Sequence, residues 1–236
     1  MIYLTSDFHF FHNKDFVYGK RGFENVEDMN AVIVSRFNRI VGPEDDVYIL
    51  GDLCLGGPDA LEDSLKLIEQ LNGRLHLVRG NHDTDKRWNA YRTCKNVVEQ
   101  KNAIYLKYHK YHFFLSHFPC ITGNLEKEAL TQMTLNIYGH THQQTNYYKD
   151  NPFMYHVGVD SHDCYPVLLD DIVKDMKEKY YEQQYYEQHK EKEELRSEPL
   201  KCNNCVEYPY YCSGSGGSCP PGLKYRRDPP DGGYYG

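Results

Sequence analysis

The fold class can be read from residues 46–83, DVYILGDLCLGGPDALEDSLKLIEQLNGRLHLVRGNHD. Apolar runs at 46–50 and 75–78 predict two strands. Between them, leucines and an isoleucine recur three and four residues apart, which predicts a helix with one apolar face. Pro58 is suited to start this helix and Gly73 to follow its end. Residues 46–83 therefore predict a strand–helix–strand unit.

A similar pattern precedes this unit. Residues 2–6 form another apolar run, and Asn25 could cap a helix in which Met29, Ile33 and Phe37 share one face. The order strand, helix, strand, helix, strand is typical of an α/β sheet whose crossover helices cover its faces.

The pattern changes after Trp88. Only His109 and Lys110 separate two apolar runs, and so short a connection requires an antiparallel hairpin. We therefore expect two packed, mixed β-sheets, of which the second is mostly antiparallel, with flanking helices in a four-layer αββα sandwich. The strands of the second sheet are predicted at 96–100, 103–108, 111–116, 134–138 and 153–159.

Composition limits the classes of protein. The chain has 236 residues, 40% hydrophobic and 26% charged, with no apolar run of the about 18 residues that a membrane span needs. Its net charge of −7 argues against diffuse attraction to long nucleic acid or anionic lipid, although it allows a local basic site. The N-terminus lacks the pattern of a cleaved leader, and Cys54, Cys94, Cys120 and Cys164 are scattered singly. We expect reduced thiols and a cytoplasmic protein.

The chain falls into three parts by composition. Residues 1–170 hold nearly all the large aliphatic segments. Residues 171–196 are rich in Lys, Glu, Gln and Tyr, which predicts a charged helix in contact with solvent. Residues 197–236 are rich in Pro, Gly, Tyr and Cys, and they hold too little apolar surface to fold unaided.

Four cysteines in the last part raise a separate question. Cys202, Cys205, Cys212 and Cys219 are enough to bind a structural zinc as a zinc knuckle. Their spacing is tighter than in a usual zinc ribbon, so reduced thiols in a disordered tail are the competing interpretation. If zinc is bound, the neighbouring tyrosines could contact a partner protein or a single nucleic-acid strand.

Polar side chains gather directly after the predicted strands. In open α/β sheets, ligands bind outside the carboxyl ends of the strands, so these side chains are candidates for one site. The set combines four imidazoles, two carboxylates and one amide, and it contains no thiolate. Its members are Asp7, His9, Asp52, Asn81, His117, His140 and His142.

This set predicts a site for two metal ions. Mixed nitrogen and oxygen donors suit divalent Mn, Fe, Zn, Co or Ni. Seven donors are too many for one tetrahedral zinc site, and they suit two ions if one carboxylate is shared. Ions about 3.5–4 Å apart can hold a hydroxide as nucleophile and neutralise the oxygens of an in-line phosphoryl displacement. Gly51, Gly80 and Gly139 each precede a candidate ligand, where the chain must turn or approach closely, although each alone could be an ordinary turn glycine.

Five segments also carry a resemblance to a known family. TSDFHFFH, YILGD, LVRGNHD, LSHFP and YGHTHQ occur in this order between residues 5 and 143. They resemble the motifs of the calcineurin-like metallophosphoesterases, and more narrowly those of the small bacterial and phage-encoded members. The resemblance stops near residue 170, which implies a metallophosphoesterase catalytic domain at residues 1–170.

The resemblance also implies a role for each site residue. Asp52 would bridge the two ions. His82 would not bind metal but would face the scissile phosphate as general acid or charge stabiliser, with Asp83 orienting it. The other ligands divide into Asp7, His9 and His142 for one ion and Asn81, His117 and His140 for the second.

Further residues near these motifs are open to two interpretations. His12 could line the substrate pocket or lie in a surface loop, and Arg79 could bind phosphate or form a structural ion pair. Asp160 and His162 could approach the metal centre from the last strand. Several basic residues could attract an anionic substrate, although each one alone is more typical of a solvated surface: Lys14, Lys20, Arg21, Lys86 and Arg87.

The expected function is metal-dependent hydrolysis of a phosphate ester, with no covalent enzyme intermediate and with His82 as general acid. Only 33 residues separate Asp83 from His117, so there is no room for a cap domain. An open site favours a phosphodiester, a nucleotide or a nucleic-acid end over a small monoester, and manganese is the expected metal. The alternative is an inactive scaffold whose tail binds a partner. Such a protein should lack a site residue, whereas every expected position is filled.

Overall fold

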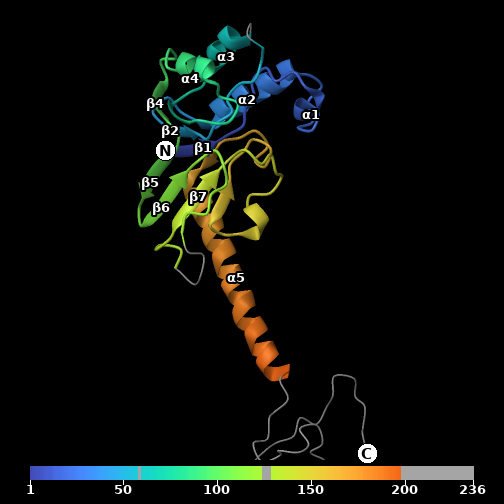
Figure 1. The fold of residues 1–236 in the computed structure, drawn as a ribbon, viewed down its shortest axis with the longest axis vertical. Coiled ribbons are helices and arrows are strands. Elements are labelled where there is room, and N and C mark those ends of the chain that lie inside the picture. The colour runs from blue at the N-terminus through green and yellow to red at the C-terminus, as the bar shows by residue number, and fades with distance from the viewer. Residues whose placement is uncertain (58–59, 124–128, 198–236) are drawn as a thin grey trace, which may run out of the picture. The chain divides into compact units, whose positions relative to one another are not determined.

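The structure is a computed structural model and describes residues 1–57, 60–123 and 129–197 (Figure 1). The chain divides into two compact units, Met1–Gln184 and Tyr185–Gly236. The first unit contains both sheets. The second unit is described to residue 197, and there the ring of Tyr185 stacks on His189 with a centroid distance of 3.9 Å.

Two of the sequence predictions lie outside the described residues. These are the start of a helix at Pro58 and the zinc knuckle of Cys202, Cys205, Cys212 and Cys219. Both remain predictions.

The first sheet is mainly parallel, as residues 1–83 predict. β1, β2, β3 and β4 pair in parallel, and β9 pairs with β1 in the antiparallel sense. Parallel pairing requires crossovers, which here are helical, so β1, β2, β3 and β4 all end at the same edge of the sheet. In spatial order the strands are β4 (Val97–Lys101), β3 (Arg74–Val78), β2 (Asp46–Ile49), β1 (Ile2–Thr5) and β9 (Val167–Leu168).

Helices cover one face of this sheet (Figure 1). Asn25 caps the first long helix as predicted, because its side-chain oxygen accepts a hydrogen bond from the amide of Asp28 at 2.8 Å. A four-residue helix, α1 (Asp15–Tyr18), was not expected. The helices on the sheet are α2 (Val26–Ile40), α3 (Ala60–Glu69) and α4 (Asp85–Tyr91).

The strand predicted at 96–100 belongs to the first sheet and not to the second. As β4 it pairs in parallel with β3, with Leu75 opposite Val97. The reason is α4, which lies in the connection between β3 and β4 and returns the chain to the edge of the sheet where β3 begins. The sequence prediction overlooked this short helix and its crossover.

The second sheet contains one antiparallel and two parallel pairs. The hairpin at residues 109–110 is confirmed, because β5 and β6 pair in the antiparallel sense. β6 and β7, and then β7 and β8, pair in parallel, so the expectation of a mostly antiparallel sheet is wrong. Residues 116–133 and 139–153 are long enough to carry the chain back across the sheet. The strands are β5 (Ile104–Tyr108), β6 (Tyr111–Leu115), β7 (Thr134–Tyr138) and β8 (Met154–His156).

The two sheets enclose a shared apolar layer. Leu4, Leu50 and Val78 of the first sheet form one buried cluster with Phe113 and Ile137 of the second. In the first sheet, the neighbouring residues Tyr3, Ile49 and Leu77 point the other way, into the cluster beneath α2, α3 and α4. The α/β class with two mixed sheets and flanking helices is therefore confirmed.

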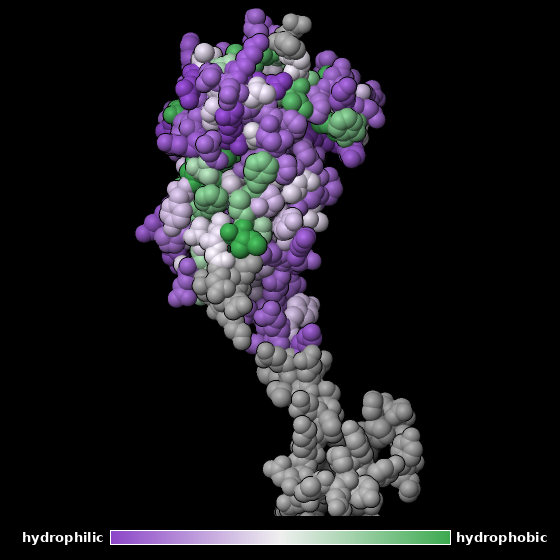
Figure 2. Space-filling view, in the orientation of Figure 1, coloured by the Kyte–Doolittle hydropathy of each residue, from purple (hydrophilic) through white to green (hydrophobic). Residues whose placement is uncertain are grey.

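The C-terminal helix α5 (Leu169–Ser197) begins directly after β9. Leu169, Ile172 and Met176 are buried in the layer between the sheets. A single 3-10 turn, η1 (Tyr148–Asp150), precedes β8. The face drawn in Figure 2 is mainly hydrophilic, and its apolar residues gather over the second sheet. Within the described ranges, no helix combines the length and apolar character that crossing a bilayer would require.

Candidate metal centre

The loops that follow β1, β2, β3, β6 and β7 meet at one place between the sheets. Backbone hydrogen bonds tie these loops to one another. The amides of Asp7 and His9 donate to the carbonyls of Gly51 and Asp52, each at 3.0 Å, and the amide of Gly139 donates to the carbonyl of His117 at 3.0 Å. The amide of His140, which donates to Oδ2 of Asp7 at 2.9 Å, joins the loops of the two sheets into one framework.

The backbone at this place has an uncommon conformation. Left-handed φ angles cost non-glycine residues about 1–3 kcal/mol each, and they gather where a site requires them. Five of the seven candidate ligands have a left-handed φ angle, which no sequence pattern indicated. They are Asp7 (61°), His9 (52°), Asp52 (57°), His140 (69°) and His142 (47°).

Two glycines permit the loops to approach one another. Gly51 has a φ of 94°, which favours glycine, whereas Gly80 is not in that region. Gly80 is needed for a different reason, because a Cβ there would collide with the Asp52 carboxylate. At Gly80, the close approach of Asp52 to the backbone, rather than a turn, requires glycine.

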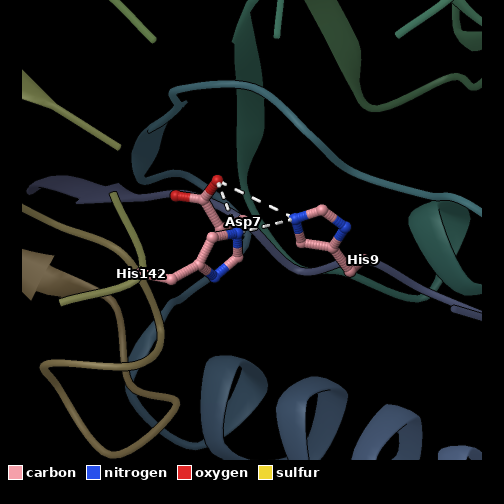
Figure 3. A group of neighbouring side chains, drawn as sticks. All are labelled: Asp7, His9 and His142. Carbon is pink, nitrogen blue, oxygen red and sulfur yellow. Dashed lines mark hydrogen bonds and ion pairs between the residues drawn. The ribbon is translucent and has the colours of Figure 1, made fainter. Parts of the chain in front are cut away.

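Asp7, His9 and His142 form a first ligand group (Figure 3). The two Nε2 atoms lie 3.2 Å apart, and each lies 3.9–4.0 Å from Oδ1 of Asp7. Asp7 Oδ2 accepts hydrogen bonds from the Ser6 hydroxyl at 2.5 Å and the His140 amide at 2.9 Å. Its other oxygen, Oδ1, is buried and has no hydrogen-bond partner among the described residues. One unpaired oxygen and two ring nitrogens therefore face a common point.

Asn81, His117 and His140 form a second ligand group. Oδ1 of Asn81 lies 2.8 Å from Nε2 of His117 and 2.9 Å from Nδ1 of His140. The two ring nitrogens are 3.2 Å apart. His117 Nδ1 donates to the carbonyl of Leu50 at 2.8 Å, which leaves Nε2 as an acceptor that faces the group.

Asp52 lies between the two groups. Its Oδ2 is 3.6 Å from Nε2 of His9 and 3.4 Å from Nε2 of His117. Oδ1 accepts a hydrogen bond from the amide of His82 at 2.9 Å. A single carboxylate thus touches one nitrogen of each group, as the sequence-based assignment of a bridging residue requires.

The donor atoms have the spacing of metal ligands. Two ligands bound at about 2.0–2.1 Å to one ion, at tetrahedral or octahedral angles, lie about 2.8–3.4 Å apart. The short distances within both groups match this spacing. Unpaired Oδ1 of Asp7 and the facing imidazole nitrogens are groups that a shared cation would satisfy, so the residues present fit divalent metal ions.

The titration of these groups follows from burial and mutual contact. Burial raises the pKa of Asp7 against the opposing effect of His142, and it lowers the pKa of His9 well below its usual range. For Asp52, burial raises the pKa, but the combined effects of the nearby His117 ring, the His82 amide and the His9 ring outweigh it, and the pKa falls to about 2. A carboxylate that stays ionised and an imidazole that stays neutral are the forms that bind a cation.

His82 lies beside these groups and is partly open to solvent. Its side chain is 41% exposed, and its Nε2 is 4.0 Å from Oδ2 of Asp52. Arg87 donates to the His82 carbonyl at 2.9 Å and to the Gly56 carbonyl at 2.8 Å, so this guanidinium holds the backbone in place. Arg87 is therefore not the simple surface charge that the sequence favoured.

Asp83 does not orient the His82 ring as expected. Its carboxylate is buried and accepts hydrogen bonds from the amides of Gly80 at 2.8 Å and Asp52 at 2.9 Å. The hydroxyl of Tyr91 donates to it at 3.0 Å. Asp83 instead fixes the loop that carries Asp52. Its position directly after His82 in the motif led to the different expectation.

The two substrate-binding candidates have different surroundings. The ring of His12 lies 5.4 Å from that of His9 and 5.7 Å from that of Phe16, so it borders the first ligand group. Arg79 donates to the Asp83 carbonyl at 2.9 Å and pairs with Asp85, which agrees with the structural ion pair that was its second interpretation.

Asp160 lies beside the centre, which is one of the two interpretations that the sequence allowed, whereas Arg21 is closer to the centre than the sequence indicated. Arg21 has a buried side chain, 3% exposed, and pairs with Asp160, which in turn contacts His142. Their separation of 139 residues left no local signal. His162 takes another direction, because its Nε2 donates to the carbonyl of His156 at 2.8 Å. The lysines at 14, 20 and 86 are exposed.

Comparison with known proteins places this arrangement in a family. Residues 1–159 match the calcineurin-like phosphoesterase superfamily domain. An uncharacterized protein of Methanocaldococcus jannaschii is 36% identical over 182 residues, covering 73% of this chain and 89% of its own. The gene 66 protein of Mycobacterium phage D29 is 29% identical over 186 residues, covering 70% and 92%.

A solved structure shows the same fold. A protein of unknown function from Aquifex aeolicus superposes with a TM-score of 0.57 at 25% identity, covering 74% of this chain and 98% of that one. Because residues 1–159 match its domain, the chain belongs to the calcineurin-like phosphoesterase superfamily, which comprises hydrolases of phosphate esters.

Proposed function

We propose that the chain is a two-metal phosphodiesterase in which Asp52 bridges the ions. The observation that carries this proposal is the position of Asp52 Oδ2, 3.6 Å from His9 Nε2 and 3.4 Å from His117 Nε2. The first ligand group and Asp52 would hold one ion, and the second ligand group and Asp52 the other. When bound, the two ions would activate water and neutralise charge on the phosphate. The donor set suits manganese, with Fe, Zn, Ni and Co as alternatives.

The residues around the ligands support this chemistry. The side chain of His82 is partly exposed and borders Asp52 Oδ2, so it can reach a phosphate and protonate the leaving oxygen. Asp83 and Arg87 hold the loops beside it through buried or backbone contacts. No side chain is required as a covalent nucleophile.

Two exposed aromatic side chains support a nucleotide-containing diester. Phe118 is 47% exposed, and its ring lies 4.7 Å from His140 and 5.0 Å from His117. Phe16 is 61% exposed and contacts His12, which borders the first ligand group. Stacking on an aromatic ring contributes about 1–3 kcal/mol per base, so these rings could bind the bases on either side of a scissile phosphate.

The test compares a diester with a monoester. The full chain, loaded with manganese, should hydrolyse bis-p-nitrophenyl phosphate with a higher kcat/KM than p-nitrophenyl phosphate. A higher value for the monoester would contradict the diester assignment. Two bound ions with no hydrolysis of either ester would instead favour the inactive scaffold.

A cytoplasmic location remains part of the proposal. The four cysteines among the described residues, Cys54, Cys94, Cys120 and Cys164, are free thiols. Such thiols agree with a reducing compartment.

A further inference from the structure

Arg21 makes an ion pair that is shielded from solvent. Its Nε and Nη2 donate to the two carboxylate oxygens of Asp160 at 2.9 and 3.0 Å, in the two-pronged geometry that a guanidinium favours. The side chains are only 3% and 7% exposed. Because a buried pair carries a high desolvation cost, its place beside the ligands calls for an explanation.

Asp160 fixes the ring of His142. Its Oδ2 lies 2.8 Å from Nδ1 of His142. An ionised carboxylate can only accept, so Nδ1 must carry the hydrogen and Nε2 must present its lone pair. Nε2 is the atom that faces Oδ1 of Asp7 at 3.9 Å and Nε2 of His9 at 3.2 Å.

The same guanidinium also fixes the loop after β1. Nη2 donates to the carbonyl of Asp7 at 2.8 Å and Nη1 to that of Phe8 at 3.1 Å. This loop carries Asp7 and His9, both with left-handed φ angles. Arg21 therefore holds the backbone of Asp7 and of Phe8, which directly precedes His9, and it reaches His142 through Asp160.

The second ligand group has different support. His117 donates to a backbone carbonyl, that of Leu50, and His140 is attached through its amide to Asp7. Neither contact involves Arg21 or Asp160. The two ion positions thus differ in the residues that hold their ligands.

We propose that Arg21 and Asp160 are positioning residues that set the metal affinity of the first ligand group and leave that of the second largely unaffected. The inference rests on the proposed two-ion site. Partners of this kind typically change metal affinity by about 10–100-fold. Asp160→Asn would present an amide N–H to His142 and favour the tautomer whose Nε2 carries the hydrogen, which opposes metal binding there.

The test measures metal binding at each position separately. In the full-length chain, His140→Ala weakens the second position, so the remaining ion reports on the first; His9→Ala does the reverse. Manganese is titrated into the metal-free proteins by calorimetry. Adding Asp160→Asn should weaken binding about 10–100-fold in the His140→Ala background and leave it within about threefold in the His9→Ala background.

Asp163→Asn is the matched control. Asp163 lies in the same loop as Asp160 and forms an ion pair with Arg36. The substitution breaks this ion pair and changes no contact of His142, so both metal affinities should stay unchanged. Arg21→Lys keeps a positive charge beside Asp160, which avoids an unpaired buried charge should Asp160→Asn fail to fold. It should show the same selective loss at the first position.

Other results would overturn the inference. These are equal weakening in both backgrounds, no weakening in either, or an equal effect of Asp163→Asn. A wild-type chain that binds fewer than two ions would instead contradict the proposed function itself, so the two failures are distinguishable.

Discussion

The first and second ligand groups contain similar donors but differ in charge and support. The first includes the Asp7 carboxylate, whereas the second has the neutral amide of Asn81, and Asp52 lies near a nitrogen of each. The first is attached to a buried arginine–aspartate pair, and the second to the backbone carbonyl of Leu50 and the carboxylate of Asp7. The first ligand group therefore has two negative charges nearby and ligands that the fold holds in place. It should bind metal before the second group does.

Asp52→Asn should have the largest effect, because it removes the charge that both positions share. We expect both metal affinities to fall together and kcat/KM to fall by more than about 10³-fold, since the shared carboxylate holds the two-ion arrangement. Metal content by mass spectrometry and diester hydrolysis measure the two effects. An unchanged metal content would show that Asp52 does not bridge.

His82→Ala should separate catalysis from metal binding. As a general acid, His82 should contribute roughly 10²–10⁴ in kcat, while both ligand groups keep their donors. Steady-state kinetics and metal content of the same preparation provide the comparison. Loss of metal in this variant would assign His82 to the ligands and contradict its proposed role.

Phe118→Leu should affect substrates according to their aromatic groups. Its ring contacts His117 and His140 of the second ligand group only. We expect about a 5–100-fold loss in kcat/KM for a dinucleoside phosphodiester, from the loss of base stacking, and little change for a dialkyl phosphodiester. Tyr105→Leu is the control, since that exposed ring lies on β5 and contacts His112 instead. Equal losses on both diesters would argue against stacking.

The smallest effect should come from an ion pair outside both ligand groups. The hydrogen bond from Arg74 lowers the pKa of Asp46 to about 2, with burial opposing and His76 assisting. A lowered pKa stabilises the fold above the ordinary carboxyl pKa, and this stability is lost as the pH falls through about 2. Because the pair is partly exposed, we expect at most about 1 kcal/mol.

Asp46→Asn should remove this pH dependence. Chemical unfolding of the metal-free chain between pH 4 and pH 2 would show a smaller loss of stability in the variant than in the wild type. Equal losses would mean that Asp46 does not contribute, and a changed metal affinity would mean that the pair is linked to the site.

Much of the fold is predictable because local patterns express it. The periodicity around Met29 and the cap at Asn25 mark α2, and the two-residue connection at 109–110 marks the β5–β6 hairpin. The parallel pairing of β6, β7 and β8 was missed because a strand's sequence does not state its partner. Every residue of β8 is buried, a pattern typical of parallel strands, but this burial is known only from the folded chain.

The candidate ligands were predictable for a related reason. Each follows an apolar run directly, and the parallel strands bring those ends together. The roles of Arg21 and Asp83 were misjudged because their partners are distant in the sequence. Arg21 pairs with Asp160, and Asp83 accepts a hydrogen bond from the amide of Asp52. No motif spacing reports a contact across 139 residues, so only the folded chain reveals the support of the first ligand group.

The most direct test of the central claim is electron paramagnetic resonance of the metal-free chain reconstituted with manganese. Asp52 should place two ions about 3.5–4 Å apart, so two equivalents should give the multiline signal of an exchange-coupled pair. The first equivalent alone should give mainly the six-line spectrum of an isolated ion, since the first ligand group should fill first. Two equivalents bound as magnetically isolated ions, or a single ion at saturation, would contradict a shared carboxylate and with it the account of the site.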